Sequence, residues 1–327
     1  MHSTDPIDLV EAGRRLGHDL YRLSRLPCHD SWPIAVREGF AASAAPQGGR
    51  LRSDDRFTHK WLQLRLGALM RGRAVAPDVT VELLRRLDVS HCPVTRQPMT
   101  HRTRLGSDAS VDRLNNDGAY AAANLAVLSS HVNRAKGTRT FDEVWALSQR
   151  TRSESGLQPV EWLRLAVLML GPAHAVQPLD VPALPLCAPL PPTSVRTALQ
   201  QVQRLLTLNC SVAASRNRLL RGLLPACDSA SSQARLRLLA DAVHMGLKRL
   251  TLADECWDVW LQPGLMEALV AWRESLGERA WAHTSRAAGQ LAGGHPVNRH
   301  ELAPWRLATR GYWLSGVGDS LAAGAQR

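Results

Sequence analysis

The sequence is poor in Phe and Tyr and has no paired cysteine motif. Its 327 residues include 3 Phe and 3 Tyr, whereas Leu, Ala and Arg dominate, and this composition favours helix over sheet. The cysteines are scattered without a Cys-x-x-Cys pair, at positions 28, 92, 187, 210, 227 and 256. This pattern argues against a disulfide framework and is typical of reduced thiols in a cytoplasmic protein.

Long apolar runs are also missing. The longest, Leu165 to Leu170, lies between Arg164 and Gly171-Pro172, which makes it too short to span a bilayer. The first residues lack the basic and then apolar profile of a signal peptide. We therefore expect a cytoplasmic protein with no membrane contact.

Acidic residues are outnumbered by basic ones. The chain has 40 Lys and Arg against 29 Asp and Glu, which gives a net charge of +11. Residues 50–140 hold 16 basic and 8 acidic residues, a balance of +8, so most of the excess is in this stretch. Such a concentration favours a polyanionic partner, because it attracts phosphates electrostatically.

The same stretch contains a pattern of strands and turns. Asn116-Asp117-Gly118 favours a turn, because these residue types tolerate positive φ. Ser129 or Ser130 can cap a helix that ends at Gly137. Two short β-prone runs flank the turn, at residues 109–114 and 124–128. The local prediction is strand, loop, strand, helix.

This order resembles the HNH (His-Me finger, ββα-metal) endonuclease family. The closest subgroup has Ser-x-Asp-Arg-x-Asp, Gly-x-Tyr, Asn and Asn-x-x-Lys, after a Cys-x-x-Thr lead-in. Here the motifs read Ser110-Val111-Asp112-Arg113-Leu114-Asn115, Gly118-Ala119-Tyr120, Asn124 and Asn133-Arg134-Ala135-Lys136, after Cys92-Pro93-Val94-Thr95. The resemblance covers about 50 residues and depends on the order and spacing of the motifs together.

The resemblance implies a site for phosphodiester hydrolysis. It makes Asp112 and Asn133 the two protein ligands of one Mg²⁺ or Mn²⁺, since carboxylate and amide oxygens suit these ions. It gives Asn124 the task of bonding backbone across the loop and holding the first strand in register. Phosphate contacts would come from basic side chains in and just after the motif: Arg113, Arg134, Lys136 and Arg139.

The motif departs from the family where the general base is expected. Most HNH enzymes have Asp-His, whereas this chain has Asp112-Arg113. Three routes are open: His91, His101 or His131 could reach the site, a metal-bound hydroxide could attack without a side-chain base, or the site could bind without cutting. Among the histidines we favour His101, which lies just upstream of the first strand.

The zinc knuckle that many HNH proteins carry is not expected here. Cys92 has Thr95 where its partner would be, and the second pair falls on Ser129 and Val132. A cluster of Cys92 with His91 and His101 lacks regular ligand spacing. We therefore expect the hydrophobic core, rather than structural zinc, to hold the finger.

We predict a mainly α protein with a small ββα finger and an all-α C-terminal domain. The expected parts are a helical N-terminal region (1–90), the HNH-like unit (91–140), helices packing on it (141–170), a linker (171–193) and a helical domain (194–327). The linker is predicted because seven prolines prevent regular structure there. The C-terminal domain could bind nucleic acid, dock a protein, dimerise or serve as structure.

The function expected from these patterns is metal-dependent endonuclease activity, on DNA rather than RNA. The alternative is a catalytically degenerate HNH fold that binds nucleic acid or a protein partner. A helical scaffold without a nucleic-acid role is the third reading. The missing base His favours degeneracy, whereas retention of Asp112 and Asn133 favours the enzyme.

Overall fold

The computed structural model describes residues 8–44, 51–73, 75–174, 183–194 and 196–291. Its elements in chain order are α1 (Leu9–Leu23), α2 (Ile34–Ser43), α3 (Arg56–Met70), α4 (Val81–Leu87), β1 (Ala109–Arg113), η1 (Ala122–Asn124), β2 (Leu125–Ser129), α5 (Ser130–Lys136), α6 (Phe141–Ser148), α7 (Pro159–His174), α8 (Ala198–Asn209), α9 (Ala213–Leu223), η2 (Leu224–Ala226), α10 (Ala230–Arg249), η3 (Cys256–Leu261), α11 (Leu265–Glu274) and α12 (Glu278–Leu291). The prediction of a mainly helical fold with a small two-stranded element is confirmed.

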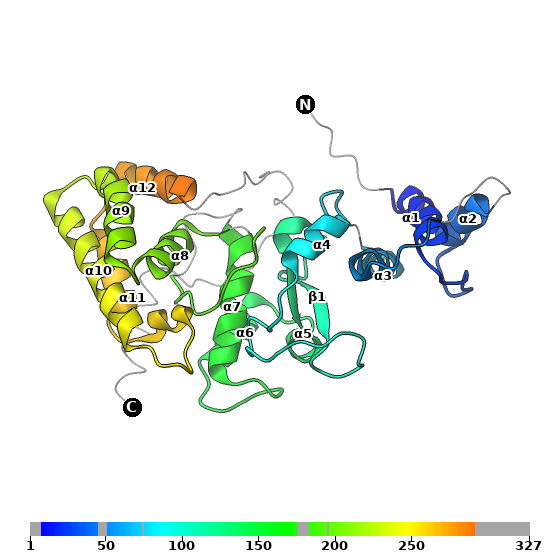
Figure 1. Cartoon of the computed structure of the whole chain (residues 1–327), viewed down its shortest axis with the longest axis horizontal. Helices are drawn as coiled ribbons and strands as arrows, with labels where there is room; N and C mark the ends of the chain where they lie inside the picture. The colour runs from blue at the N-terminus through cyan, green and yellow to red at the C-terminus, as the bar shows by residue number, and fades with distance from the viewer. Residues whose placement is uncertain (1–7, 45–50, 74, 175–182, 195, 292–327) are drawn as a thin grey trace.

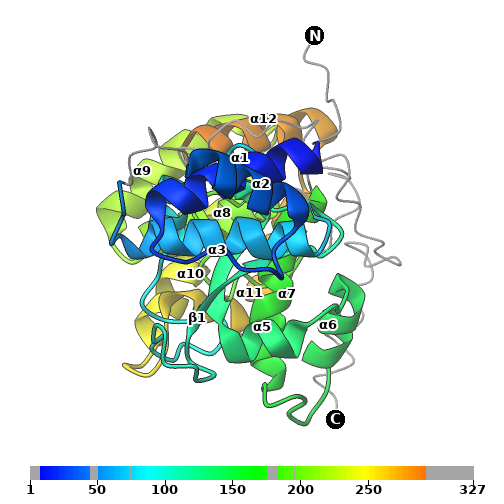
Figure 2. The same ribbon diagram turned by 90° about the vertical axis from the view of Figure 1, so that its right-hand side faces the viewer.

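The molecule is elongated, with α1–α3 at one end, the β1–β2 sheet in the middle and α8–α12 at the other end (Figure 1). Figure 2 looks onto the N-terminal end, where α1 packs against both α2 and α3. The helices α1 and α2 approach closely at glycines. A Cβ on Gly17 would lie 2.0 Å from the Val36 carbonyl oxygen, and one on Gly39 would lie 2.0 Å from that of Arg14. Larger residues would force the two helices apart.

The sheet is an antiparallel pair with helices on both faces. Val111 pairs with Val127 and Asp112 with Ala126, and side chains alternate between the two faces. One face packs with α3 and α4 through Leu125, Val127 and their neighbours. The other face, with Leu114, Ala126 and Leu128, belongs to the large core around α5, α6 and α7. Both faces of the sheet are therefore buried against helices.

A side-chain cap sets the start of α4. The helix begins at Val81, because the Thr80 hydroxyl accepts a hydrogen bond from Leu83 N (3.1 Å) and caps it there. The helix α7 contains the apolar run 165–170 and ends at His174. In the predicted all-α C-terminal domain, residues 256–261 form the 3₁₀ helix η3. The first seven residues of the predicted N-terminal region and the C-terminal domain from residue 292 lie outside the described residues.

The described end of the proline-rich segment is irregular but buried. Ala183, Leu184, Leu186, Cys187 and Ala188 are each at most 2% exposed. They belong to one apolar cluster that extends from the finger through α7 to α12. The described part of the predicted linker is therefore packed in the core rather than exposed, and the division of the chain into domains at this segment stays a prediction. Residues 175–182 of the segment lie outside the described residues.

Among the described helices, none is long and apolar enough to cross a membrane.

Candidate functional site

Two polar contacts join β1 and α5, and each involves one of the predicted metal ligands. Ser110 and Asp112 are two positions apart on the strand and therefore share a face. Asn133 and Lys136 are three positions apart on the helix and share a face too. The Asn133 amide donates to the Ser110 hydroxyl (2.7 Å), and Lys136 Nζ lies 3.0 Å from Asp112 Oδ2. Strand and helix are thus joined by two polar contacts.

The Lys136–Asp112 contact is a buried ion pair. Asp112 is 7% exposed and Lys136 is fully buried. The Lys136 ammonium also donates to the carbonyl oxygen of Arg113 (2.7 Å) and to Asn116 Oδ1 (3.1 Å), so three acceptors surround its three protons. Burial raises the pKa of the Asp112 carboxyl, and the positive charge of Lys136 opposes that rise.

These residues do not fit a divalent cation as they are arranged. The position beside the Asp112 carboxylate already holds the positive charge of Lys136, 3.0 Å away. Asn133 turns its amide nitrogen, rather than an oxygen, toward the Ser110 hydroxyl. A Mg²⁺ or Mn²⁺ site here would require Lys136 to move, and it stays a prediction.

Asn124 holds the loop between the strands. Its side chain is fully buried. In the described part of the chain, all of its hydrogen-bond partners are backbone groups. The Asn124 Oδ1 accepts from Asn115 N (2.8 Å), while its Nδ2 donates to the carbonyl oxygens of Asn115 (2.9 Å) and Ala119 (3.1 Å). This is the backbone bonding that the resemblance implies, and it fixes the end of β1. Asn124 therefore has a positioning role.

Arg113 stabilises the same loop. Its Nη1 donates to the carbonyl oxygens of Asn116 (2.8 Å) and Gly118 (2.9 Å), and its guanidinium lies 4.8 Å from the centre of the Tyr120 ring. Three loop contacts occupy this side chain. Arg113 is on the opposite face of β1 from Asp112, so it does not replace the missing histidine beside that carboxylate.

The other predicted phosphate contacts differ in exposure. Arg134 is exposed, while Arg139 donates to the Ala135 carbonyl oxygen (2.5 Å) and lies 5.7 Å from the Trp162 ring centre. Lys136 is fully buried with its protons engaged, so a direct phosphate contact is excluded in this arrangement. The sequence pattern could not reveal this, since lysine is usually exposed.

The three histidines considered as bases are bonded elsewhere. His101 Nε2 lies 2.8 Å from Arg56 Nη1, His131 Nε2 lies 3.4 Å from the Gly156 carbonyl oxygen, and His91 Nδ1 lies 2.9 Å from the Ser90 hydroxyl. Cys92 is inside the core, where its sulfur accepts from Ser129 N (3.4 Å). The structure pairs Asp112 with Lys136 and Asn133 with Ser110, and it leaves His101 on the loop before β1.

That loop, residues 100–108, is pinned by Asp108. The carboxylate accepts hydrogen bonds from the Thr100 hydroxyl (2.8 Å), from the hydroxyl (2.7 Å) and amide (3.1 Å) of Thr103, and from Arg104 N (2.6 Å). Burial alone would raise the pKa of Asp108, but these hydrogen bonds outweigh it and hold the pKa at about 2. Arg102 and Arg104 adopt positive φ of 59° and 64° within the loop. The loop therefore has a fixed, sparsely populated backbone shape.

The lowered pKa of Asp108 leads to a prediction about how stability depends on pH. Because the folded pKa (about 2) lies below the ordinary 3.8, ionised Asp108 contributes stability that is fully present above pH 4 and is lost as pH falls toward 2. The difference in free energy of unfolding between wild type and Asp108→Asn should therefore shrink over that range, as measured by urea unfolding at each pH. A difference that does not change with pH would contradict this account.

Two residues missed by the sequence reasoning lie beside this loop. Arg56 and Lys60, four positions apart on α3, reach the start of β1, where Lys60 Nζ donates to the Ala109 carbonyl oxygen (2.9 Å). Their spacing could have identified them, because residues four apart share a helix face. Comparison of the chain with protein families, with curated proteins and with solved structures finds no significant match.

Proposed function

We propose that this chain binds nucleic acid, DNA in preference to RNA, through an HNH-like ββα finger whose metal position is closed by an internal ion pair. The observation that carries the proposal is the Lys136–Asp112 contact of 3.0 Å in a buried setting. It supplies a protein cation where the resemblance implies a divalent one. The finger keeps the strand–helix frame of the family without an accessible catalytic carboxylate.

The charge around the finger supports a polyanionic partner. Residues 50–140 have a balance of +8, from 16 basic and 8 acidic residues. Of the arginines in and beside the finger, Arg134, Arg102 and Arg104 are exposed. Basic side chains at the surface of a protein bind phosphates and release counterions, which makes such binding strongly dependent on salt.

Binding is tested with fluorescently labelled duplex DNA, single-stranded DNA and RNA of equal length. We expect anisotropy to report binding in EDTA, with an affinity that falls by at least about tenfold between 50 and 200 mM salt, as several phosphate contacts require. Duplex or single-stranded DNA should bind more tightly than RNA. The proposal fails if none of the three binds at 50 mM salt, or if the affinity is independent of salt.

Metal-dependent cleavage is a second candidate, favoured by one observation. Asp112 and Asn133 project from facing elements onto the same interface, as the resemblance implies for its two ligands. Purified protein should then nick plasmid DNA with Mg²⁺ or Mn²⁺ but not with EDTA, and Asp112→Asn should lose this activity while it still binds. Absence of cleavage under all these conditions favours the binding protein.

A further inference from the structure

A polar cleft lies between α3 and the loop of residues 100–108, at the beginning of β1. Its volume is about 280 Å³. Basic side chains from two segments line it: Arg56, His59 and Lys60 from α3, and His101 and Arg102 from the loop. None of these residues except His101 belongs to the motif-based predictions for the finger. The cleft therefore lies outside the strand–helix interface that holds Asp112.

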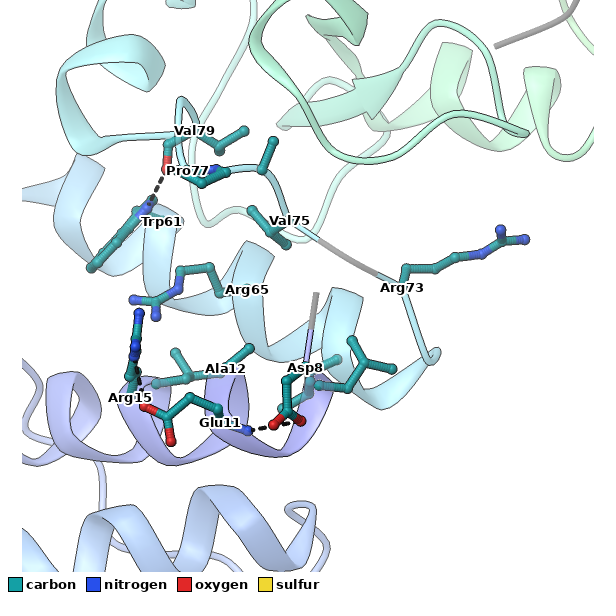
Figure 3. Close-up of a pocket in the computed structure, with 14 residues that line it drawn as sticks. Asp8, Glu11, Ala12, Arg15, Trp61, Arg65, Arg73, Val75, Pro77 and Val79 are labelled. Carbon is teal, nitrogen blue, oxygen red and sulfur yellow. Dashed lines mark hydrogen bonds and ion pairs between the residues drawn. The ribbon is translucent and has the colours of Figure 1, made fainter. Parts of the chain in front are cut away.

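The position of the cleft follows from helix geometry. Arg56, His59, Lys60 and Gln63 recur at three- and four-residue spacing and share one face of α3. The opposite face of α3 lines a different cavity of about 460 Å³, bounded by α1, Arg73 and residues 75–79, in which Trp61 donates to the Val79 carbonyl oxygen (Figure 3). The cavity of Figure 3 is mostly apolar, and we find no feature that identifies an occupant for it.

Lys60 is a partly buried cation that could still bind an anion. Its ammonium donates to the Ala109 carbonyl oxygen (2.9 Å), and within the described structure it has no other hydrogen-bond partner. Two of its three protons are therefore available to a ligand. Burial lowers the pKa of the Lys60 amine, and Arg56 adds to this shift, whereas Asp88 and Asp108 oppose it. An anion in the cleft would stabilise the charged ammonium.

The carboxylates at the cleft are engaged elsewhere. Asp88 is bonded to Arg56, and the oxygens of Asp108 accept the hydrogen bonds of their own loop. Neither forms a salt bridge with Lys60 or Arg102 among the described residues. The nearest polar contact of Arg102 is weak, with Nη2 at 3.4 Å from His59 Nδ1. Lys60 and Arg102 thus remain the two cations without an acidic partner.

We propose that this cleft binds a phosphate group of the nucleic acid, with Lys60 and Arg102 as its charged ligands and His59 beside them. The inference rests on the proposed function and deepens it, because it places a contact outside the ββα motif. Arg102 is presented by a loop whose shape Asp108 fixes, and Lys60 by the rigid helix α3. The two charges are therefore positioned before the ligand arrives.

The test compares two double variants of the full chain. Lys60→Gln/Arg102→Gln removes both proposed ligands, while Arg22→Gln/Arg86→Gln removes two exposed arginines that do not line the cleft. Arg22 in α1 and Arg86 in α4 lie outside the finger, and their replacement changes the net charge by the same amount. We expect the cleft variant to bind labelled duplex DNA at least about tenfold more weakly than the control, with a salt slope reduced by about two.

A second measurement separates this inference from the proposed function. The thermal midpoint of each variant is compared in sodium phosphate and in sodium chloride of equal ionic strength, since a ligand of the folded state raises it. If DNA binds but both double variants weaken it equally, the cleft is overturned and the proposed function stands. If DNA does not bind but phosphate stabilises wild type and not the cleft variant, the cleft holds a phosphate from another ligand and the proposed function fails. If DNA does not bind and phosphate does not stabilise the wild type, both the phosphate site in the cleft and the proposed function are wrong.

Discussion

Lys136→Met should lower the free energy of unfolding by about 3–5 kcal/mol, which is the usual cost of removing one partner from a buried ion pair. The reason is that Asp112, 7% exposed, would keep a buried charge with no cation beside it. The carbonyl oxygen of Arg113 and Asn116 Oδ1 would also lose their donor. Urea unfolding measures the change, with Lys248→Met as the control, because Lys248 is exposed on α10 and should shift stability by less than about 0.5 kcal/mol.

A double-mutant cycle identifies the pair as the cause. If the loss comes from the unpaired charge, Asp112→Leu should be less harmful in the Lys136→Met background than in wild type, with a coupling of about 2 kcal/mol. A coupling near zero would mean that Lys136 stabilises the loop alone.

The pH dependence of Lys136→Met gives a further check. Burial already raises the pKa of Asp112, and loss of Lys136 removes the charge that opposes the rise. A folded pKa above the ordinary 3.8 means that the contribution of Asp112 to the stability of the variant is greatest below pH 3.8 and is lost as pH rises from there through the folded pKa of Asp112. Wild type should show a smaller loss over the same range, because Lys136 offsets the buried charge.

The frame of the finger could be predicted from the sequence because local chemistry sets it. Ser129 caps α5 by accepting from Val132 N (3.3 Å), and Gly137 ends it with a φ of 52° that glycine adopts readily. Asn124 bonds the loop as the resemblance implies. Each of these features depends on residues within about ten positions of one another, so the spacing of the motif is enough to specify them.

The chemistry of the site could not be predicted in the same way. Which acceptors surround Lys136 depends on the register of β1 against β2 and on the rotation of α5, and both are set by packing. The cleft at Lys60 joins segments more than 40 residues apart. The prediction of a linker depends on the prolines of this segment alone. The burial of residues 183–188 is instead determined by the apolar side chains between the prolines.

The shared core predicts an effect of Asp258 that reaches the finger. Asp258 on η3 accepts from Arg96 Nη1 (2.5 Å) and Nη2 (2.6 Å) and lies 3.6 Å from Arg164 Nη2. The side chains of Arg96 and Arg164 are only 17% and 10% exposed, so Asp258→Ala would leave Arg164 without a carboxylate among the described residues and Arg96 with only Glu255, at 3.4 Å. We expect a loss of about 3–5 kcal/mol and a fall in the thermal midpoint on the order of 10 °C.

Hydrogen exchange can locate the loss of stability in Asp258→Ala. If the finger and the C-terminal helices unfold as one unit, Asp258→Ala should reduce amide protection in β1 and β2 as well as in α11, although the substitution is in η3. The control is Asp241→Ala, whose exposed ion pair with Arg216 is worth at most about 1 kcal/mol. Two independently packed regions would give a different result: protection would fall in α11 while β1 and β2 kept theirs. That outcome would support the division of the chain into two domains at the proline-rich segment, because the Arg96–Asp258 contact would then join two domains without coupling their unfolding.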